Sequence, residues 1–118
     1  MKKRILLIED EENQRILYRE ELTRNGYDVL VAGNGNEGLA VLESEQVDCV
    51  VLDIRMPSMD GLETLGTMLG RRKDLPVIIY TAYSHYKNDF MSWAANAYLV
   101  KHSDMTELVE KIRELCHG

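Results

Sequence analysis

The sequence contains little cysteine, no long apolar run and no cluster of basic residues, and each absence excludes a class of protein. Two cysteines in 118 residues do not make the disulfide framework of a small secreted domain, and Cys49, inside an apolar run, is predicted to be a small core residue. No stretch approaches the length of a membrane-spanning helix. The apolar run 5–8 ends at Glu9, too early for a secretory signal. We therefore expect a cytoplasmic protein without a membrane segment.

The charge balance is acidic, with a formal net charge of -6 from 20 acidic and 14 basic residues. No basic stripe is visible, and a nucleic-acid surface needs one, so we expect no nucleic-acid contact by this domain. A length of 118 residues suits one compact domain with a sizeable core. We expect residues 1–118 to form that domain.

Four short apolar runs each end in a residue with a polar or charged side chain. The runs are 5–8, 49–52, 77–80 and 98–100, and the residues that follow them are Glu9 with Asp10, Asp53, Thr81 and Lys101. Continuous apolar runs are typical of parallel strands covered by helices on both faces. Ligands of such sheets bind outside the carboxyl ends of the strands. We therefore expect three carboxylates, a hydroxyl and an ammonium group to converge at one edge, a set suited to a phosphoryl group and a divalent cation.

The segments between these runs predict helices and one more strand. A helix over 12–25 carries Ile16, Leu17 and Leu22, and Gly26 is a suitable stop. Further expected elements are a strand over 27–31, a helix over 38–45, a loop over 55–61, a helix over 62–69, a strand opened by Pro76 and a helix over 85–95. A last helix, capped by Ser103-Asp104, presents Leu108, Val109, Ile112 and Leu115. Strict alternation of strand and helix predicts an α/β fold, a doubly wound parallel sheet.

The order of these motifs resembles the receiver domain of two-component response regulators over the whole chain. The residues that carry the resemblance are Glu9-Asp10, Asp53, Met56-Pro57, Met59-Asp60-Gly61, Thr81-Ala82 and Lys101. Each motif alone is weak, but together they are specific because each follows the appropriate strand. The resemblance implies a flavodoxin-like (βα)5 sheet in the order 2-1-3-4-5. It also implies transfer of a phosphoryl group from a sensor histidine kinase, or a phosphotransfer protein, onto one aspartate.

The acidic residues can be assigned roles on this basis. Asp53 is expected to be the phosphoacceptor, because a carboxylate can form an acyl phosphate. Asp10 and Glu9, with Asp53, are expected to hold Mg²⁺, a hard ion that prefers oxygen ligands. The family pattern suggests that Asp10 binds directly and Glu9 through water, with the backbone carbonyl of Arg55 as a further ligand. The domain is not an enzyme in the usual sense, since it would catalyse only its own phosphorylation and dephosphorylation.

Thr81 and Lys101 are expected to complete the catalytic site with Asp53, and Thr81 and Tyr98 are expected to transmit the signal. Lys101 would pair with a phosphoryl oxygen, and the Thr81 hydroxyl would donate to another. Tyr98, three residues before the lysine, is either a fixed core aromatic or a switch that rotates inward when Thr81 moves. The surface affected would comprise the helix over 85–95, the strand over 98–100 and the last helix. That surface would contact an unknown downstream target or a second copy of the chain.

Two other functions fit parts of the sequence. Residues 33–38 match G-x-G-x-x-G, with Gly33, Gly35 and Gly38 after a strand and before a helix, and Asp53 falls twenty residues beyond Gly33. This is the dinucleotide-binding spacing, but the motif is not in the first βα unit. The preferred interpretation is a tight turn that Gly33 and Gly35 allow and that Asn34 and Asn36 favour. An Asp-nucleophile phosphatase would also fit residues 50–53. Such enzymes need a second aspartate two residues after the nucleophile, where this chain has Arg55.

One departure from the family pattern concerns the fifth strand. The family usually has Lys-Pro with a cis peptide bond, whereas this chain has Lys101-His102. A cis bond without proline costs about 3 kcal/mol. We therefore expect the Lys101–His102 bond to be trans.

Overall fold

The structure is a computed structural model that describes residues 2–53, 66, 72, 74–82, 95–102 and 104–116. Apart from isolated positions, the expected loop over 55–61 and the expected helices over 62–69 and 85–95 lie outside the described residues. Arg55 and Ser103 lie outside them as well.

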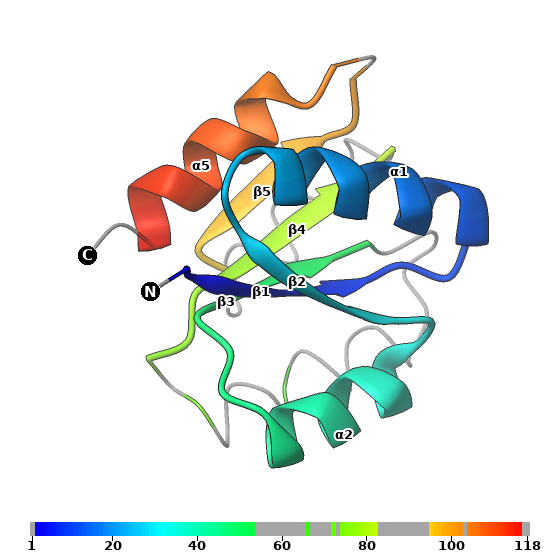
Figure 1. The fold of residues 1–118 in the computed structure, drawn as a ribbon, viewed down its shortest axis with the longest axis vertical. Coiled ribbons are helices and arrows are strands. Elements are labelled where there is room, and N and C mark those ends of the chain that lie inside the picture. The colour runs from blue at the N-terminus through cyan, green and yellow to red at the C-terminus, as the bar shows by residue number, and fades with distance from the viewer. Residues whose placement is uncertain are drawn as a thin grey trace.

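The described residues form a five-stranded parallel sheet in the order β2-β1-β3-β4-β5 (Figure 1). The strands are β1 (Arg4–Ile8), β2 (Asp28–Ala32), β3 (Cys49–Leu52), β4 (Val77–Thr81) and β5 (Ala97–Val100). The predicted fold class and strand order are therefore confirmed. Because the order reverses beside β1, the carboxyl ends of β1 and β3 lie next to each other, and a crevice forms there in sheets of this type.

Helices cover both faces of the sheet. Helices α1 (Glu12–Arg24) and α5 (Thr106–Cys116) lie on one face, and α2 (Gly35–Ser44) lies on the other (Figure 1). Side chains alternate between the faces along each strand. Ile5 and Leu7 join the core under α1 and α5, whereas Leu6 and Ile8 join the core under α2. This burial on both faces explains why the strand sequences are continuously apolar.

Helix α1 buries a different set of side chains from the one that its apolar residues suggest. Tyr18 and Leu22 are buried, but Ile16 and Leu17 are 48% and 57% exposed. Positions 18 and 22 are one helical turn apart and lie on the same face of the helix. Positions 16 and 17 lie outside that face. The expected end of the helix is confirmed, because Gly26 follows it with a φ of 96°, a left-handed conformation in which glycine carries no strain.

Helix α2 begins at Gly35, three residues before the predicted start at Gly38. Asn34 caps it, since its Oδ1 accepts a hydrogen bond of 2.9 Å from the Glu37 amide. The prediction of a tight turn at Gly33 and Gly35 is therefore wrong for Gly35, which is the first helical residue. Gly38 is needed for a close approach, since a Cβ there would lie 2.5 Å from Cδ1 of Ile8.

Helix α5 follows its prediction closely. Leu108, Val109 and Ile112 are buried, and Leu115 packs at the edge of the same cluster. The Asp104 carboxylate accepts a bond of 3.0 Å from the Thr106 amide, which confirms its part in the expected cap. Cys49 is buried in the core, as predicted, and both cysteines are free thiols. In the described part of the chain no helix is long and apolar enough to cross a membrane.

Candidate functional site

The polar residues at the strand ends meet at the carboxyl edge of the sheet. Asp53 follows β3, and its amide donates a bond of 3.0 Å to the Ile8 carbonyl at the end of β1. The Lys101 amide, after β5, donates a bond of 2.7 Å to the Thr81 carbonyl at the end of β4. By alternation, Glu9, Asp53 and Lys101 continue the strand positions that face α1 and α5. Thr81 lies at a position that faces the opposite side.

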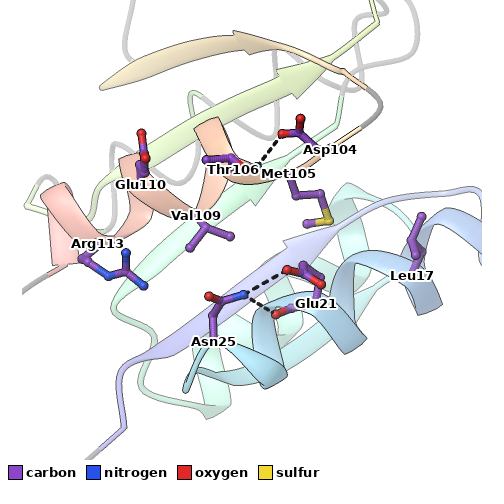
Figure 2. A pocket seen from close by; sticks show the side chains of 9 residues that line it. All are labelled: Leu17, Glu21, Asn25, Asp104, Met105, Thr106, Val109, Glu110 and Arg113. Carbon is purple, nitrogen blue, oxygen red and sulfur yellow. Dashed lines mark hydrogen bonds between the residues drawn. The ribbon is translucent and has the colours of Figure 1, made fainter.

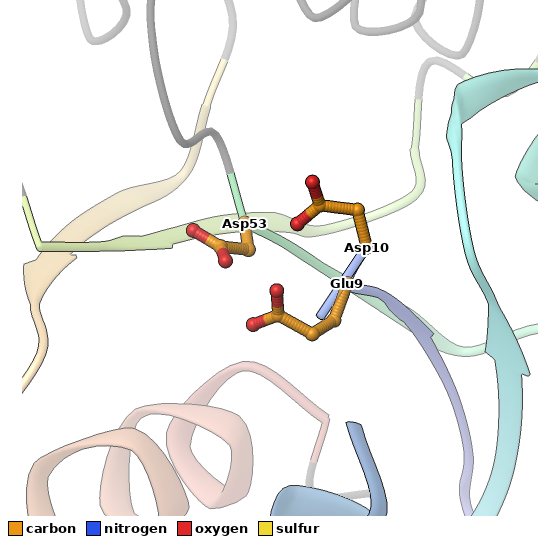
Figure 3. A group of neighbouring side chains, drawn as sticks. All are labelled: Glu9, Asp10 and Asp53. Atoms are coloured by element: carbon orange, nitrogen blue, oxygen red, sulfur yellow. The ribbon is translucent and has the colours of Figure 1, made fainter. Parts of the chain in front are cut away.

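Glu9, Asp10 and Asp53 form a cluster in which one carboxylate oxygen of each lies within 4.8 Å of the others (Figure 3). Glu9 is 1% exposed, the Asp53 side chain is 5% exposed, and Asp10 is open to solvent. Three oxygen ligands at the open edge of a site are what a hard divalent cation needs while it keeps several of its waters. The residues present therefore fit Mg²⁺. Arg55, the fourth predicted contributor, lies outside the described residues.

Lys101 supplies positive charge to this cluster. Its Nζ lies 2.8 Å from Oδ2 of Asp53 and 3.0 Å from Oε1 of Glu9. Its side chain is 13% exposed, so these ion pairs are only partly screened by water. One ammonium group thus contacts two of the three clustered carboxylates. The chemistry that this arrangement supports is attack by Asp53 on an electrophile whose negative charge Lys101 and a cation can offset.

The electrostatics of the cluster show which effect dominates at each group. Burial, and then the neighbouring Asp53, raise the pKa of Glu9 to about 7 from its ordinary 4.5, although Lys101 acts in the opposite direction. For Lys101, burial favours the neutral amine, but the hydrogen bonds and charges of Asp53 and Glu9 outweigh burial and raise its pKa. Repulsion by Asp53 therefore adds to burial in raising the pKa of Glu9.

Three residues near Lys101 were missed by the sequence analysis. Gln14 and Tyr18 on α1, and Tyr80 on β4, surround its ammonium group. Lys101 donates to the Gln14 side-chain oxygen, and its Nζ lies 5.1 Å from the Tyr18 ring centroid. The available signals were the spacing of four between Gln14 and Tyr18, which places both on one helical face, and the position of Tyr80 directly before Thr81.

Thr81 and Tyr98 lie on the same face of the sheet, opposite to Lys101. Thr81 is 1% exposed, and Tyr98 packs in the core under α2. In the register of β4 with β5, Ile79 is opposite Tyr98 and Thr81 is opposite Val100. Tyr98 is therefore already inward in this structure, which differs from the outward starting position that the switch hypothesis assumed.

The glycine-containing segment before α2 does not have the features of a phosphate cradle. The Gly33 amide donates to Oε1 of Glu37 at 3.0 Å, and the Glu37 amide donates to the Asn34 side chain. The amides that would face a pyrophosphate are thus capped by side chains of the segment itself. The dinucleotide interpretation has no support in this geometry.

A hollow of about 390 Å³ lies between α1 and α5 (Figure 2). It is lined by Leu17, Glu21, Asn25, Asp104, Met105, Thr106, Val109, Glu110 and Arg113. The hydrogen bonds drawn there run within single segments, from Asn25 to Glu21 and between Thr106 and Asp104. These bonds lie at helix ends, so the hollow is a gap between two packed helices.

Comparison with known proteins gives a consistent result. The family model described as the response regulator receiver domain matches residues 5–113. The response regulator MprA of Mycobacterium tuberculosis is 36% identical over 117 residues, which are 98% of this chain and 51% of that protein. The transcriptional regulatory protein PcoR of Escherichia coli is 31% identical over 114 residues, 95% of this chain and 50% of that protein. The chain thus spans about half the length of these curated relatives.

Two solved structures are more similar to this chain in sequence than these relatives are, and a third has a similar fold. The response regulator protein TrrA of Thermotoga maritima, solved in complex with Mg(2+)-BeF, is 47% identical with a TM-score of 0.88, over 96% of this chain and 98% of that one. TrrA in complex with the histidine kinase ThkA gives 47% identity and a TM-score of 0.86, over 96% and 97% of the two chains. A CheY-like receiver domain protein from Methanospirillum hungatei is 32% identical, with a TM-score of 0.86 over 97% and 93%.

Proposed function

The chain belongs to the receiver-domain family of two-component response regulators, and from this premise we propose that Asp53 is its phosphoacceptor. The single observation that carries the proposal is the cluster of Glu9, Asp10 and Asp53 with Lys101 paired to Asp53 at 2.8 Å. We extend the proposal to the whole of residues 1–118 as one receiver domain acting in the cytoplasm. It would be a signalling domain that catalyses only its own phosphorylation and dephosphorylation.

The transfer follows from the positions of the atoms. Lys101 holds Oδ2 of Asp53, so the other carboxylate oxygen attacks the phosphorus. An O–P bond forms while the P–N bond of a phosphohistidine, or the P–O bond of a small acyl phosphate, breaks with its electron pair leaving on the donor. Lys101 then donates to a phosphoryl oxygen. The product is an acyl phosphate on Asp53.

Glu9, Asp10, Asp53 and the backbone carbonyl of Arg55 would hold Mg²⁺. When bound, the ion supplies the positive charge that lets a dianionic phosphoryl group approach three carboxylates. The residues themselves contribute the oxygen ligands, and the open side at Asp10 leaves room for water. Support comes from the carboxylate oxygens of Glu9, Asp10 and Asp53, which lie within 4.8 Å of one another. Further support comes from the Mg(2+)-BeF complex of TrrA.

The phosphoryl donor would be a sensor histidine kinase or a phosphotransfer protein. The donor's histidine must reach Asp53, so the partner must cover the carboxyl edge of the sheet. Helix α1 begins two residues after Asp10 and exposes Ile16 and Leu17, an apolar contact next to that edge. We propose this surface for the partner, and we propose a histidine kinase as the partner because TrrA forms a complex with the kinase ThkA.

The output would pass through Thr81 and Tyr98. A phosphoryl group on Asp53 would attract the Thr81 hydroxyl, and the space around the buried Tyr98 ring would change because both lie on one face of β4 and β5. A downstream target, or a second copy of the chain, would then bind the surface that includes β5 and α5. A difference in affinity of a few kcal/mol between the two states is sufficient.

The test is intact-mass spectrometry after incubation with acetyl phosphate and Mg²⁺. We expect addition of one phosphoryl group, lost in Asp53→Asn and in EDTA. Asp48→Asn is the matched control, because Asp48 lies at the opposite end of β3 and binds the Arg4 amide. Labelling that persists in Asp53→Asn would refute the proposal.

Metal binding is tested separately by thermal unfolding with and without Mg²⁺. A ligand that binds only the folded state raises the melting temperature. Asp10→Asn removes one of three repelling carboxylates, so the metal-free variant should melt a few degrees higher. The same variant should need at least about tenfold more Mg²⁺ for the same shift, because one ligand is lost. An unchanged melt of the parent in millimolar Mg²⁺ would contradict the assigned site.

A further inference from the structure

The ammonium group of Lys101 has three donors, and in this structure all three are used. Two donate to the carboxylates, Asp53 Oδ2 at 2.8 Å and Glu9 Oε1 at 3.0 Å, and one donates to the side-chain oxygen of Gln14. The first two acceptors are the groups that phosphoryl transfer and metal binding change. The Gln14 amide is neutral and takes part in neither event, so its bond can persist through both.

From this arrangement we propose that Gln14, held by Tyr18, is a positioning residue that fixes the ammonium group of Lys101 beside Asp53. The inference rests on the proposed function, since it assigns how the lysine of that site is held. Gln14 touches neither the phosphoryl group nor Asp53; it acts through Lys101.

Gln14 is itself fixed in place. Its Oε1 also accepts a bond of 3.1 Å from the Tyr18 hydroxyl, one helical turn later on α1. Its backbone amide donates at 2.9 Å to the Glu11 carboxylate, which caps the helix. Burial raises the pKa of Tyr18, so its hydroxyl stays protonated and donates. The first bond orients the side-chain oxygen of Gln14, which accepts from Lys101 as well, and the second fixes the backbone that carries it.

Aromatic rings complete the cradle. The Lys101 Nζ lies 5.1 Å from the Tyr18 centroid and 5.9 Å from the Tyr80 centroid, within range of cation–π attraction. The two rings pack edge to face, with centroids 5.4 Å apart and planes at 66°. Both rings are buried, so they shield this side of the Lys101 ammonium group from solvent. Without such contacts, the flexible side chain of a lysine samples many rotamers and its ammonium group has no single position.

The variants are chosen to separate positioning from folding. Gln14→Met keeps the length and volume of the side chain but removes the strong acceptor. Tyr18→Phe keeps the ring and removes the hydroxyl that orients Gln14. Asn13→Met is the control, because Asn13 is the exposed neighbour on the same turn of α1. Labelling by acetyl phosphate with Mg²⁺ is measured over a range of donor concentrations, together with Mg²⁺ affinity.

We expect Gln14→Met to reduce the maximal labelling rate about tenfold, since a small misplacement of a catalytic group is costly. Its Mg²⁺ affinity should stay within about twofold of the parent, because the metal ligands are intact. Tyr18→Phe should reduce the maximal labelling rate by a few-fold. The double variant should match Gln14→Met alone, since both act through one bond. Additive losses, or equal rates in Gln14→Met and Asn13→Met, would overturn the proposal.

A spectroscopic readout keeps this test independent of the proposed function. Lysine Nζ signals in ¹H–¹⁵N spectra are seen when the ammonium group is held in hydrogen bonds and exchanges slowly. We expect a Lys101 signal in the metal-free parent and in Asn13→Met, and its loss in Gln14→Met. If the parent is not labelled at all, the proposed phosphotransfer fails, yet the signal still tests the cradle. A Lys101 signal unchanged in Gln14→Met would refute the positioning role.

Discussion

Lys101 and Asp53 are 48 residues apart in sequence and follow strands that do not touch, yet their side chains form an ion pair of 2.8 Å. β4 lies between β3 and β5, so the lysine reaches across the end of β4. This geometry makes the pair sensitive to both the charge at Asp53 and the position of Lys101.

Replacing Lys101 by Met should destabilise the metal-free protein. The change leaves the buried carboxylates of Glu9 and Asp53 without their shared cation. We expect a loss of up to about 3 kcal/mol in the free energy of unfolding, measured by urea in EDTA. Lys111→Met is the control, because the pair of Lys111 with Glu114 lies at the surface and contributes about 1 kcal/mol or less. Equal losses in both variants would show that Lys101 does not balance the cluster.

Stability of the metal-free protein should depend on pH through Glu9. Its pKa is 4.5 ordinarily and about 7 in the folded state, so between these values the folded chain holds a proton that the unfolded chain releases. The stabilising contribution of Glu9 is therefore fully present below about pH 4.5 and is lost as pH rises through about 7. The comparison is urea unfolding of the parent and Glu9→Gln in EDTA. A difference between the two that stays flat across this window would contradict the raised pKa.

Gly38→Ala should destabilise the fold although alanine is the better helix former. The added Cβ would meet Cδ1 of Ile8 at 2.5 Å and its Cγ1 at 3.0 Å, and forcing extra volume into a core costs about 1–3 kcal/mol. The gain in helix propensity is about 1 kcal/mol, so a net loss of about 1 kcal/mol is expected. Ile8→Val removes Cδ1, so Gly38→Ala should cost less stability in the Ile8→Val background than in the parent. If the losses of stability in Gly38→Ala and Ile8→Val simply add, the strain does not arise from the contact between these two residues.

Thr81→Ala should separate phosphorylation from output. The chemistry is assigned to Asp53, so the variant is expected to accept phosphate from acetyl phosphate. It lacks the hydroxyl that would respond, so addition of beryllofluoride with Mg²⁺ should no longer change its self-association or partner binding. Light scattering measures the first and titration the second. Thr81→Ser, which keeps the hydroxyl at a buried position, should behave like the parent. A Thr81→Ala protein that still responds would remove Thr81 from the signalling route.

The sequence by itself determined the sheet and the identity of the charged residues at its edge. Continuous apolar runs require burial on both faces, and the residue after each run must then leave the sheet at its carboxyl end. Asp53 and Lys101 were predicted to lie at one edge in this way, and the structure brings their side chains to 2.8 Å from each other. The trans bond at Lys101–His102 is also as expected, since no cis peptide bond occurs among the described residues. These features depend on local pattern and on topology, which the sequence contains.

Only the tertiary structure decided where α2 begins and which side chains α1 brings to the site. The start of α2 was missed because a side-chain cap at Asn34 outweighs the low helix propensity of Gly35. The contact of Gln14 with Lys101 was missed because the sequence does not show which face of α1 packs on the sheet. Tyr18 turns inward and Ile16 outward, and that choice brings Gln14 to a lysine 87 residues away. Contacts of this range depend on the packing of whole elements, which no local pattern encodes.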